Sequence, residues 1–174
     1  MEKQDTTAVL PALTLRAPEP SDIDFIYRWE NDPALWHNSL TPPLTSRQQI
    51  WEYVHSFTGD IARDGSLRLM IQPAGSTEPA GTIDICDFNR RGNAAFVSIY
   101  VDASLRGRHI GTEALAQALT LAREALGIDT LAALIRTDNP ASAAIFAANG
   151  FTRTGALPDW LGRGQDLEIF CRRL

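Results

Sequence analysis

The spacing of apolar residues changes along the chain between alternation, which predicts strands, and a three-to-four-residue period, which predicts helices. An alternating segment at residues 12–16 predicts a first strand. A helix is expected to begin at Ser21 and to end near Pro33, because the residue before proline disfavours helix. A second amphipathic helix is predicted over residues 46–58.

The rest of the pattern predicts three antiparallel strands, a long helix, a strand, a short helix and two final strands. These elements cover residues 67–71, 80–88, 94–101, about 110–126, 130–136, 139–149, 151–155 and 167–172. The two strands that flank the long helix are expected to be parallel, because that helix is a crossover between them. The order therefore predicts a mixed α/β sheet.

The length of 174 residues fits one domain, expected over residues 11–174 after a flexible tail at residues 1–10. An apolar fraction of 44% and a charged fraction of 21% are typical of a soluble globular protein. The formal net charge of −5 disfavours nucleic acid as a partner.

The two cysteines, Cys86 and Cys171, fall in predicted strands and show no metal-ligand spacing. Free thiols are typical of a reducing cytoplasm. The polar first residues do not resemble a signal peptide, and no apolar run approaches the roughly 20 residues of a membrane span. We therefore expect a cytoplasmic protein without a membrane partner.

A loop of small and basic residues, 106–112, follows the strand at 94–101 and opens the long helix. A helix N-terminus offers unpaired N–H groups and a partial positive charge, so such a loop can hold phosphate. Gly107 and Gly111 let the backbone approach a ligand closely. An ordinary turn with solvated arginines would explain the loop alone equally well, and its spacing matches neither common nucleotide fingerprint.

Several motifs in order resemble the GNAT superfamily of acyl-CoA-dependent N-acetyltransferases, nearest to the branch of ribosomal-protein N-terminal and spermidine acetyltransferases. They lie at residues 25–33, 81–84, 106–115, 138–142 and 149–151. The resemblance implies a mostly antiparallel sheet of six to seven strands with helices on both faces. It also implies direct acetyl transfer from acetyl-CoA, without a metal, to the amine of a protein N-terminus, a polyamine or a small metabolite.

The family pattern [Gln/Arg]-x-x-Gly-x-[Gly/Ala] reads here Arg106-x-x-His109-x-Gly111. The resemblance implies that this loop binds the CoA pyrophosphate. Its residues are Arg106, Gly107, Arg108, His109, Ile110, Gly111 and Thr112. His109 replaces the middle glycine, which is costly if the backbone φ is positive there, and its side chain would contact a phosphate or face solvent.

The resemblance further implies that the sheet opens beside residues 98–101, so that Ile99, Tyr100 and Val101 contact the pantetheine. Asn139 reads as an N-cap with proline after it, and the resemblance adds a contact with CoA. Ser142 is a second CoA contact or a solvated residue. Phe146 is implied beside the cofactor, although packing in the helix core explains it as well.

Two residues that many family members use are missing. Phe146 occupies the position of a tyrosine acid, and the pair at 95–96 lacks the glutamate frequent in this branch. Asp84 and Glu113 are the remaining catalytic candidates. Asp84 could instead make a structural hydrogen bond, and Glu113 could be a first-turn acid favoured by the helix dipole.

The acceptor pocket of the family is built near residues 28–36. The candidate substrate-binding residues are Arg28, Trp29, Glu30, Asp32, Trp36 and Asp87. A packed helix end, with both tryptophans in the core, is the alternative. The missing tyrosine and glutamate also favour a second interpretation, a non-catalytic acyl-CoA-binding or regulatory protein. A homodimer is compatible with either.

Overall fold

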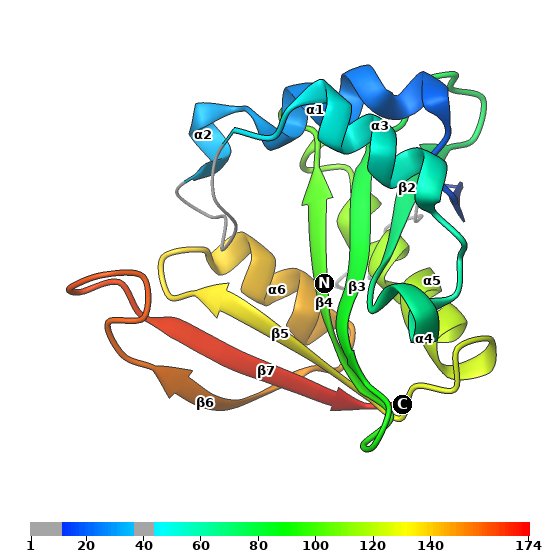
Figure 1. Ribbon diagram of the computed structural model, residues 1–174. Coiled ribbons are helices and arrows are strands. Elements are labelled where there is room, and N and C mark those ends of the chain that lie inside the picture. Colours follow the sequence, from blue (N-terminus) through cyan, green and yellow to red (C-terminus); the bar gives the residue numbers. More distant parts are fainter. Residues whose placement is uncertain (1–11, 37–43) are drawn as a thin grey trace, which may run out of the picture.

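The computed structural model describes residues 12–36 and 44–174, so the expected tail at 1–10 lies outside the described residues. The described strands form one sheet in the order β1-β2-β3-β4-β5-β7-β6 (Figure 1). They are β1 (Leu13–Arg16), β2 (Leu67–Pro73), β3 (Gly81–Asn89), β4 (Ala94–Val101), β5 (Thr130–Arg136), β6 (Thr152–Leu157) and β7 (Leu167–Arg173). The sheet is mixed and mostly antiparallel, as predicted, and β4–β5 is its parallel pair.

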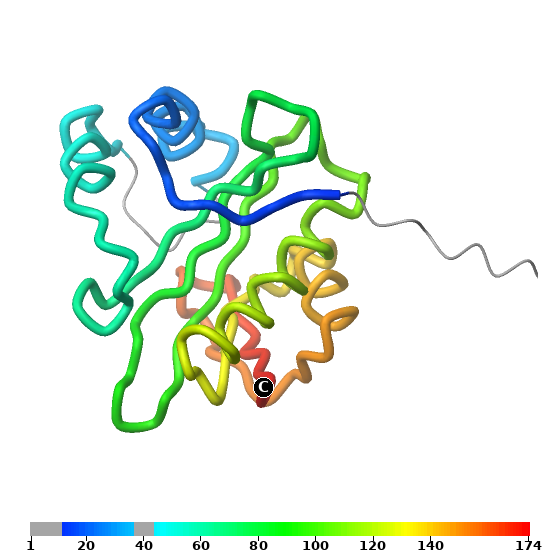
Figure 2. Tube along the Cα trace, turned by 90° about the vertical axis from the view of Figure 1, so that its right-hand side faces the viewer, coloured from blue at the N-terminus to red at the C-terminus, as the bar shows by residue number. Residues whose placement is uncertain are grey.

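Helices cover both faces of the sheet (Figure 2). They are α1 (Ile23–Glu30), α2 (Pro33–Trp36), α3 (Arg47–Ser56), α4 (Ile61–Asp64), α5 (Ile110–Glu124) and α6 (Pro140–Ala148), with 3-10 turns η1 (Pro20–Asp22) and η2 (Ala103–Leu105). The sequence predicted α1, α3, α5 and α6 but not α2 and α4, because four residues are too few to show a helical period.

Alternation along the strands separates two cores. On one face, Ile83 and Ile85 of β3 pack with Leu115 of α5 and Phe146 of α6. On the other face, Met70 of β2 packs with α1 and α3. Residue 84 of β3 therefore faces α1 and α3, because successive strand side chains point to opposite faces.

The sheet opens between its two parallel strands. β4 and β5 pair from Ala94 with Thr130 to Phe96 with Ala132, and there the pairing ends. Both strands continue, β4 to Val101 and β5 to Arg136, and they diverge in Figure 1. The opening expected beside residues 98–101 is therefore present, and it exposes one backbone edge of β4.

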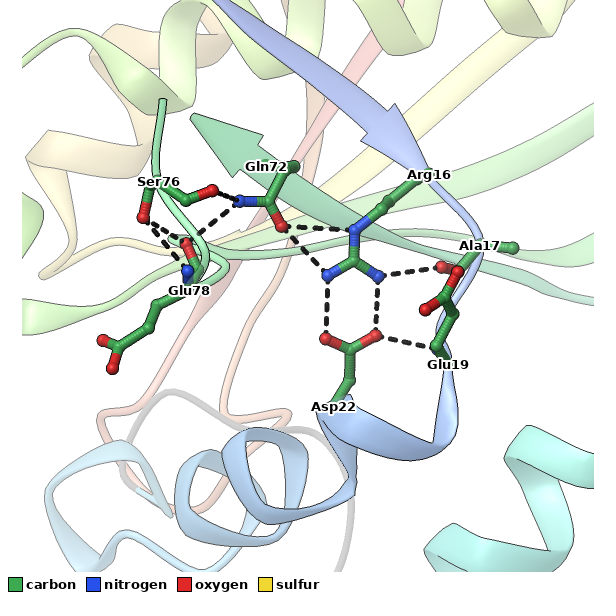
Figure 3. A network of polar contacts seen from close by, with 7 residues as sticks. All are labelled: Arg16, Ala17, Glu19, Asp22, Gln72, Ser76 and Glu78. Carbon is green, nitrogen blue, oxygen red and sulfur yellow. Dashed lines mark hydrogen bonds and ion pairs between the residues drawn. The ribbon is translucent and has the colours of Figure 1, made fainter. Parts of the chain in front are cut away.

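A polar network anchors the start of α1 to the edge of the sheet (Figure 3). Arg16 donates to both carboxylate oxygens of the buried Asp22, at 2.6 and 2.8 Å. Gln72 of β2 accepts from the same guanidinium at 3.0 and 3.2 Å. The expected helix start at Ser21 is wrong, because residues 20–22 form a 3-10 turn and α1 begins at Ile23.

Candidate active site

A cavity of about 420 Å³ lies between α1–α2 and the sheet, where β4 and β5 separate. We call it the acceptor pocket, because the family resemblance led us to expect an acceptor site near residues 28–36. It is lined by Ile26, Trp29, Glu30, Leu35, Trp36, Arg68, Thr82, Asp84, Cys86, Asp87, Phe96, Val97, Ser98, Ile99, Tyr100 and Leu134. It therefore brings together Trp29, Glu30, Trp36, Asp84 and Asp87 of the residues predicted for substrate or catalysis.

The charged centre of the pocket is a three-residue cluster. Arg68 of β2 donates to the two carboxylate oxygens of Asp84 at 2.6 and 3.1 Å, and to Glu30 of α1 at 2.6 Å. Burial would lower the pKa of the Arg68 guanidinium, but the carboxylates of Asp84 and Glu30 outweigh burial and raise that pKa. Arg68 thus stays charged at neutral pH.

Sequence reasoning missed Arg68. It stands between Leu67 and Leu69 in an apolar strand, and the cross-strand register places it opposite Asp84. A basic residue and an acidic residue in neighbouring apolar strands are the available signal, since each needs a partner when half buried. The hydrogen bonds from Arg68 therefore confirm the alternative interpretation, in which Asp84 is a structural hydrogen-bond partner.

Trp29 connects α1 to the end of β4. Its indole is 6% exposed, its Nε1 donates to Asp102 at 2.8 Å, and its ring centroid lies 5.3 Å from that of Tyr100. Burial, and then the charge of Asp102, raise the pKa of Tyr100 to about 12, so its hydroxyl remains protonated at neutral pH. Trp29 thus belongs to the hydrophobic core and also lines the pocket.

Of the other residues predicted to bind the acceptor, two line the pocket and two do not. Trp36 is 38% exposed and lines the pocket, whereas Asp87 is exposed at a bulge in β3. Arg28 points instead toward Asp102, with which it forms an ion pair at 3.6 Å. Asp32 accepts from the backbone N–H of Ala34 at 2.9 Å and so caps α2. Arg28 and Asp32 are not among the pocket-lining residues.

The predicted phosphate loop runs into α5 with an uncapped N-terminus. His109 has φ 58° and ψ 10°, in the left-handed region, and its side chain makes no capping hydrogen bond within the described chain. The first backbone bond of the helix runs from Glu113 to the His109 carbonyl, so the N–H groups of Ile110, Gly111 and Thr112 precede it. His109 therefore adopts the conformation that suits the family's glycine.

Arg106 and Gly111 serve the local structure of this loop. Arg106 Nε donates to the Val101 carbonyl at 3.0 Å and so folds over the end of β4. A Cβ on Gly111 would lie 3.0 Å from Ile145 Cδ1 and 3.6 Å from Ile99 Cδ1. α5 thus packs closely against α6 and β4 at position 111, and the approach of a ligand to Gly111 stays a prediction.

The residues predicted on α6 divide into cap and core. Asn139 accepts from the Ser142 backbone N–H at 3.1 Å, which confirms the N-cap. Phe146 is 2% exposed and packs edge-on against Phe151, with ring centroids 5.0 Å apart. Asn149 donates to the carbonyl of Thr112 at 3.2 Å, joining α6 to the first turn of α5.

Glu113 lies apart from the acceptor pocket. Its carboxylate accepts from Gln117 Nε2 at 2.8 Å, and the same nitrogen donates to the Leu13 carbonyl of β1 at 3.0 Å.

Across residues 12–36 and 44–174, no cluster of acidic, cysteine and histidine side chains could hold a metal ion. In the same ranges, no helix is long and apolar enough to cross a membrane.

Solved structures of known proteins share the fold described above. Spermidine N-acetyltransferase from Vibrio cholerae, in complex with CoA and spermine, superposes with a TM-score of 0.82 at 21% identity, over 92% of this chain and 95% of that one. RimL, a ribosomal L7/L12 alpha-N-protein acetyltransferase in complex with CoA, gives 0.82 at 22% identity, over 96% of each chain. These likenesses show that the chain shares the fold of these two proteins.

Residues 12–152 match the model of the acetyltransferase (GNAT) domain, and the chain belongs to this family. The Bacillus subtilis protein YwnH, a candidate phosphinothricin acetyltransferase, is 39% identical over 83 residues, which are 46% of this chain and 50% of YwnH. The match thus spans about half the length of that relative. The resemblance inferred from the sequence motifs is confirmed.

Proposed function

We propose that the protein transfers an acetyl group from acetyl-CoA directly to a primary amine, on a protein N-terminus, a polyamine or a small metabolite. Membership of the GNAT acetyltransferase family supports the reaction class. The observation that carries it is the end of β4–β5 pairing at Phe96, beside the acceptor pocket. A cofactor lying in that opening would have its thioester in contact with the pocket.

The chain supplies two features that fit CoA. The uncapped N–H groups of residues 110–112, with Arg108 nearby, suit the pyrophosphate. The unpaired edge of β4 at residues 97–101 suits the amides of the pantetheine, by the same hydrogen bonds that add a strand to a sheet. Asn139 and Ser142 would make further cofactor contacts, and His109 would contribute through its backbone conformation, with its side chain exposed.

The acceptor amine would enter from the α1–α2 side. Asp84 and Glu30 would bind its ammonium group, and Asp84 would take a proton directly or through water. Positioning of the amine against the thioester would supply much of the rate. The cytoplasmic location, the homodimer and the single domain remain predictions.

Isothermal titration of acetyl-CoA tests the cofactor site. Arg108→Glu should weaken binding at least tenfold, because it places a carboxylate beside the phosphates. Arg123→Glu, the same change at the other end of α5, is the matched control and should leave the affinity unchanged. Equal affinities in the two variants would contradict the assignment of the loop.

Release of CoA thiol upon addition of amines tests the reaction itself. We expect saturable release that depends on both substrates. A protein that binds acetyl-CoA yet releases no thiol with any amine would be the non-catalytic acyl-CoA-binding protein that the missing tyrosine suggested.

A further inference from the structure

The acceptor pocket has apolar walls around its one charged cluster. The apolar side chains come from α1, α2, β4 and β5, and they include Ile26, Trp29, Leu35, Trp36, Phe96 and Leu134. Aromatic and branched aliphatic side chains of this kind bind the apolar body of a ligand by burying its surface. The walls thus favour an acceptor with a hydrophobic body.

The net charge of the cluster can be neutralised by a single positive charge. Two carboxylates, Glu30 and Asp84, face one guanidinium, Arg68, which leaves one net negative charge. The three side chains are only 22–28% exposed, so water screens this charge incompletely. Asp87 is exposed at the rim, where water screens its charge and weakens its pairing with a ligand.

We propose that Arg68 sets the specificity of the pocket by limiting its net charge to that of one ammonium group. The acceptor is then a primary monoamine with an aromatic or branched aliphatic body. A second ammonium, as in a polyamine, would either lie against apolar walls, which is costly, or pair with the exposed Asp87, whose charge water screens. This inference rests on the proposed acetyl transfer.

An amine panel tests the substrate class. Thiol release from acetyl-CoA is measured with phenethylamine, tryptamine, spermidine and a short peptide that begins with serine. We expect kcat/KM for the two aromatic amines to exceed that for spermidine and for the peptide at least tenfold. Preference for spermidine or for the peptide would overturn the inference while leaving acetyl transfer intact. Failure of every amine would count against acetyl transfer itself.

Arg68→Gln tests the role of Arg68. The change keeps hydrogen-bonding capacity but leaves the two carboxylates with two negative charges. We expect the ratio of kcat/KM for spermidine to that for phenethylamine to rise at least tenfold. Arg47→Gln is the matched control, because Arg47 pairs with Asp24 at the exposed surface. An unchanged ratio in folded Arg68→Gln would overturn the proposal.

Trp36→Ala gives an independent test that does not disturb the charges. Trp36 is 38% exposed, so its loss is tolerable for folding. We expect about a tenfold rise in KM for phenethylamine and little change for ethylamine, which has almost no body to bury. Trp51→Ala, which removes a 51% exposed tryptophan outside the pocket, should change neither value. Equal effects of the two variants on phenethylamine would contradict the hydrophobic-body assignment.

Discussion

A Cβ atom on Gly81 would lie 2.0 Å from the backbone carbonyl oxygen of Tyr100. Gly81 begins β3 and pairs with Val101 at the end of β4, next to the opening in the sheet. The obstructing atom belongs to the backbone, so relief requires the two strands to separate. Only glycine permits this approach.

Gly81→Ala should therefore lower the free energy of unfolding by about 3 kcal/mol or more, as severe overpacking does. It should also weaken acetyl-CoA binding, because the displaced end of β4 borders the cofactor opening. Urea unfolding and calorimetry measure the two effects. Gly92→Ala in the β3–β4 turn, where a Cβ would be 3.7 Å from Asn89, is the control and should change stability by less than about 0.5 kcal/mol.

Arg68→Met should destabilise the fold by about 3 kcal/mol, because it leaves two half-buried carboxylates without their counter-charge. Adding Glu30→Gln and Asp84→Asn to Arg68→Met should recover most of that loss. Chemical denaturation of the two variants checks both values. If the triple variant were no more stable than Arg68→Met, the cost would come from packing and not from unpaired charge.

His109→Gly should stabilise the protein by about 0.5 kcal/mol, since relief of the left-handed conformation slightly exceeds the entropy that glycine adds to the unfolded chain. Acetyl-CoA affinity should stay within about twofold, because the loop backbone is preserved. His109→Val should destabilise the protein, since a β-branched residue tolerates positive φ poorly. Thermal unfolding ranks the three proteins, and a Val variant as stable as the Gly variant would refute the backbone assignment.

Cys86 should react slowly with iodoacetamide. Burial, and then the charges of Asp87 and Asp84, raise its pKa to about 11, so only about one thiol in a thousand is ionised at pH 8. In a Cys171→Ser background we expect alkylation about a hundredfold slower than that of the same protein unfolded in urea. The rate should climb as the pH rises toward 11, and a rate that is already maximal at pH 8 would contradict the assignment.

Protonation of Asp102 should lower the stability of the fold at acidic pH. The Ser104 hydroxyl, followed by the Trp29 indole, donates to its carboxylate and lowers its pKa below the usual value. A group with a lowered folded pKa stabilises the protein above its unfolded pKa, near 3.9, and that contribution disappears as the pH falls through the folded pKa. Wild type should thus exceed Asp102→Asn in stability at pH 6, and the gap should narrow by pH 2.5.

Sequence periodicity and caps predicted the later elements well. The strand at 130–136 has the predicted bounds, and the helix expected over 139–149 is α6 with Asn139 as its cap. These predictions depend on local signals, namely alternation, a capping side chain and a terminal glycine. Such signals act within a few residues and can be read from one segment.

The centre of the pocket could not be predicted in the same way. The pairing of Arg68 with Asp84 depends on the register of β2 against β3, and that with Glu30 depends on how α1 crosses the sheet. The sequence did not reveal that Gly111 packs closely against Ile145, because the two residues are 34 positions apart. Long-range packing decided both cases.

Three residue pairs, from Ala94 with Thr130 to Phe96 with Ala132, join the four strands on one side of the sheet to the three on the other. Within the described chain, this short seam is the part of the sheet with the fewest rungs. A molecule bound between β4 and β5 would form hydrogen bonds with backbone groups that lack a strand partner. It would thereby link the two halves of the sheet. Backbone amides at the ends of β4 and β5 should then exchange with solvent more slowly when acetyl-CoA is bound than in its absence.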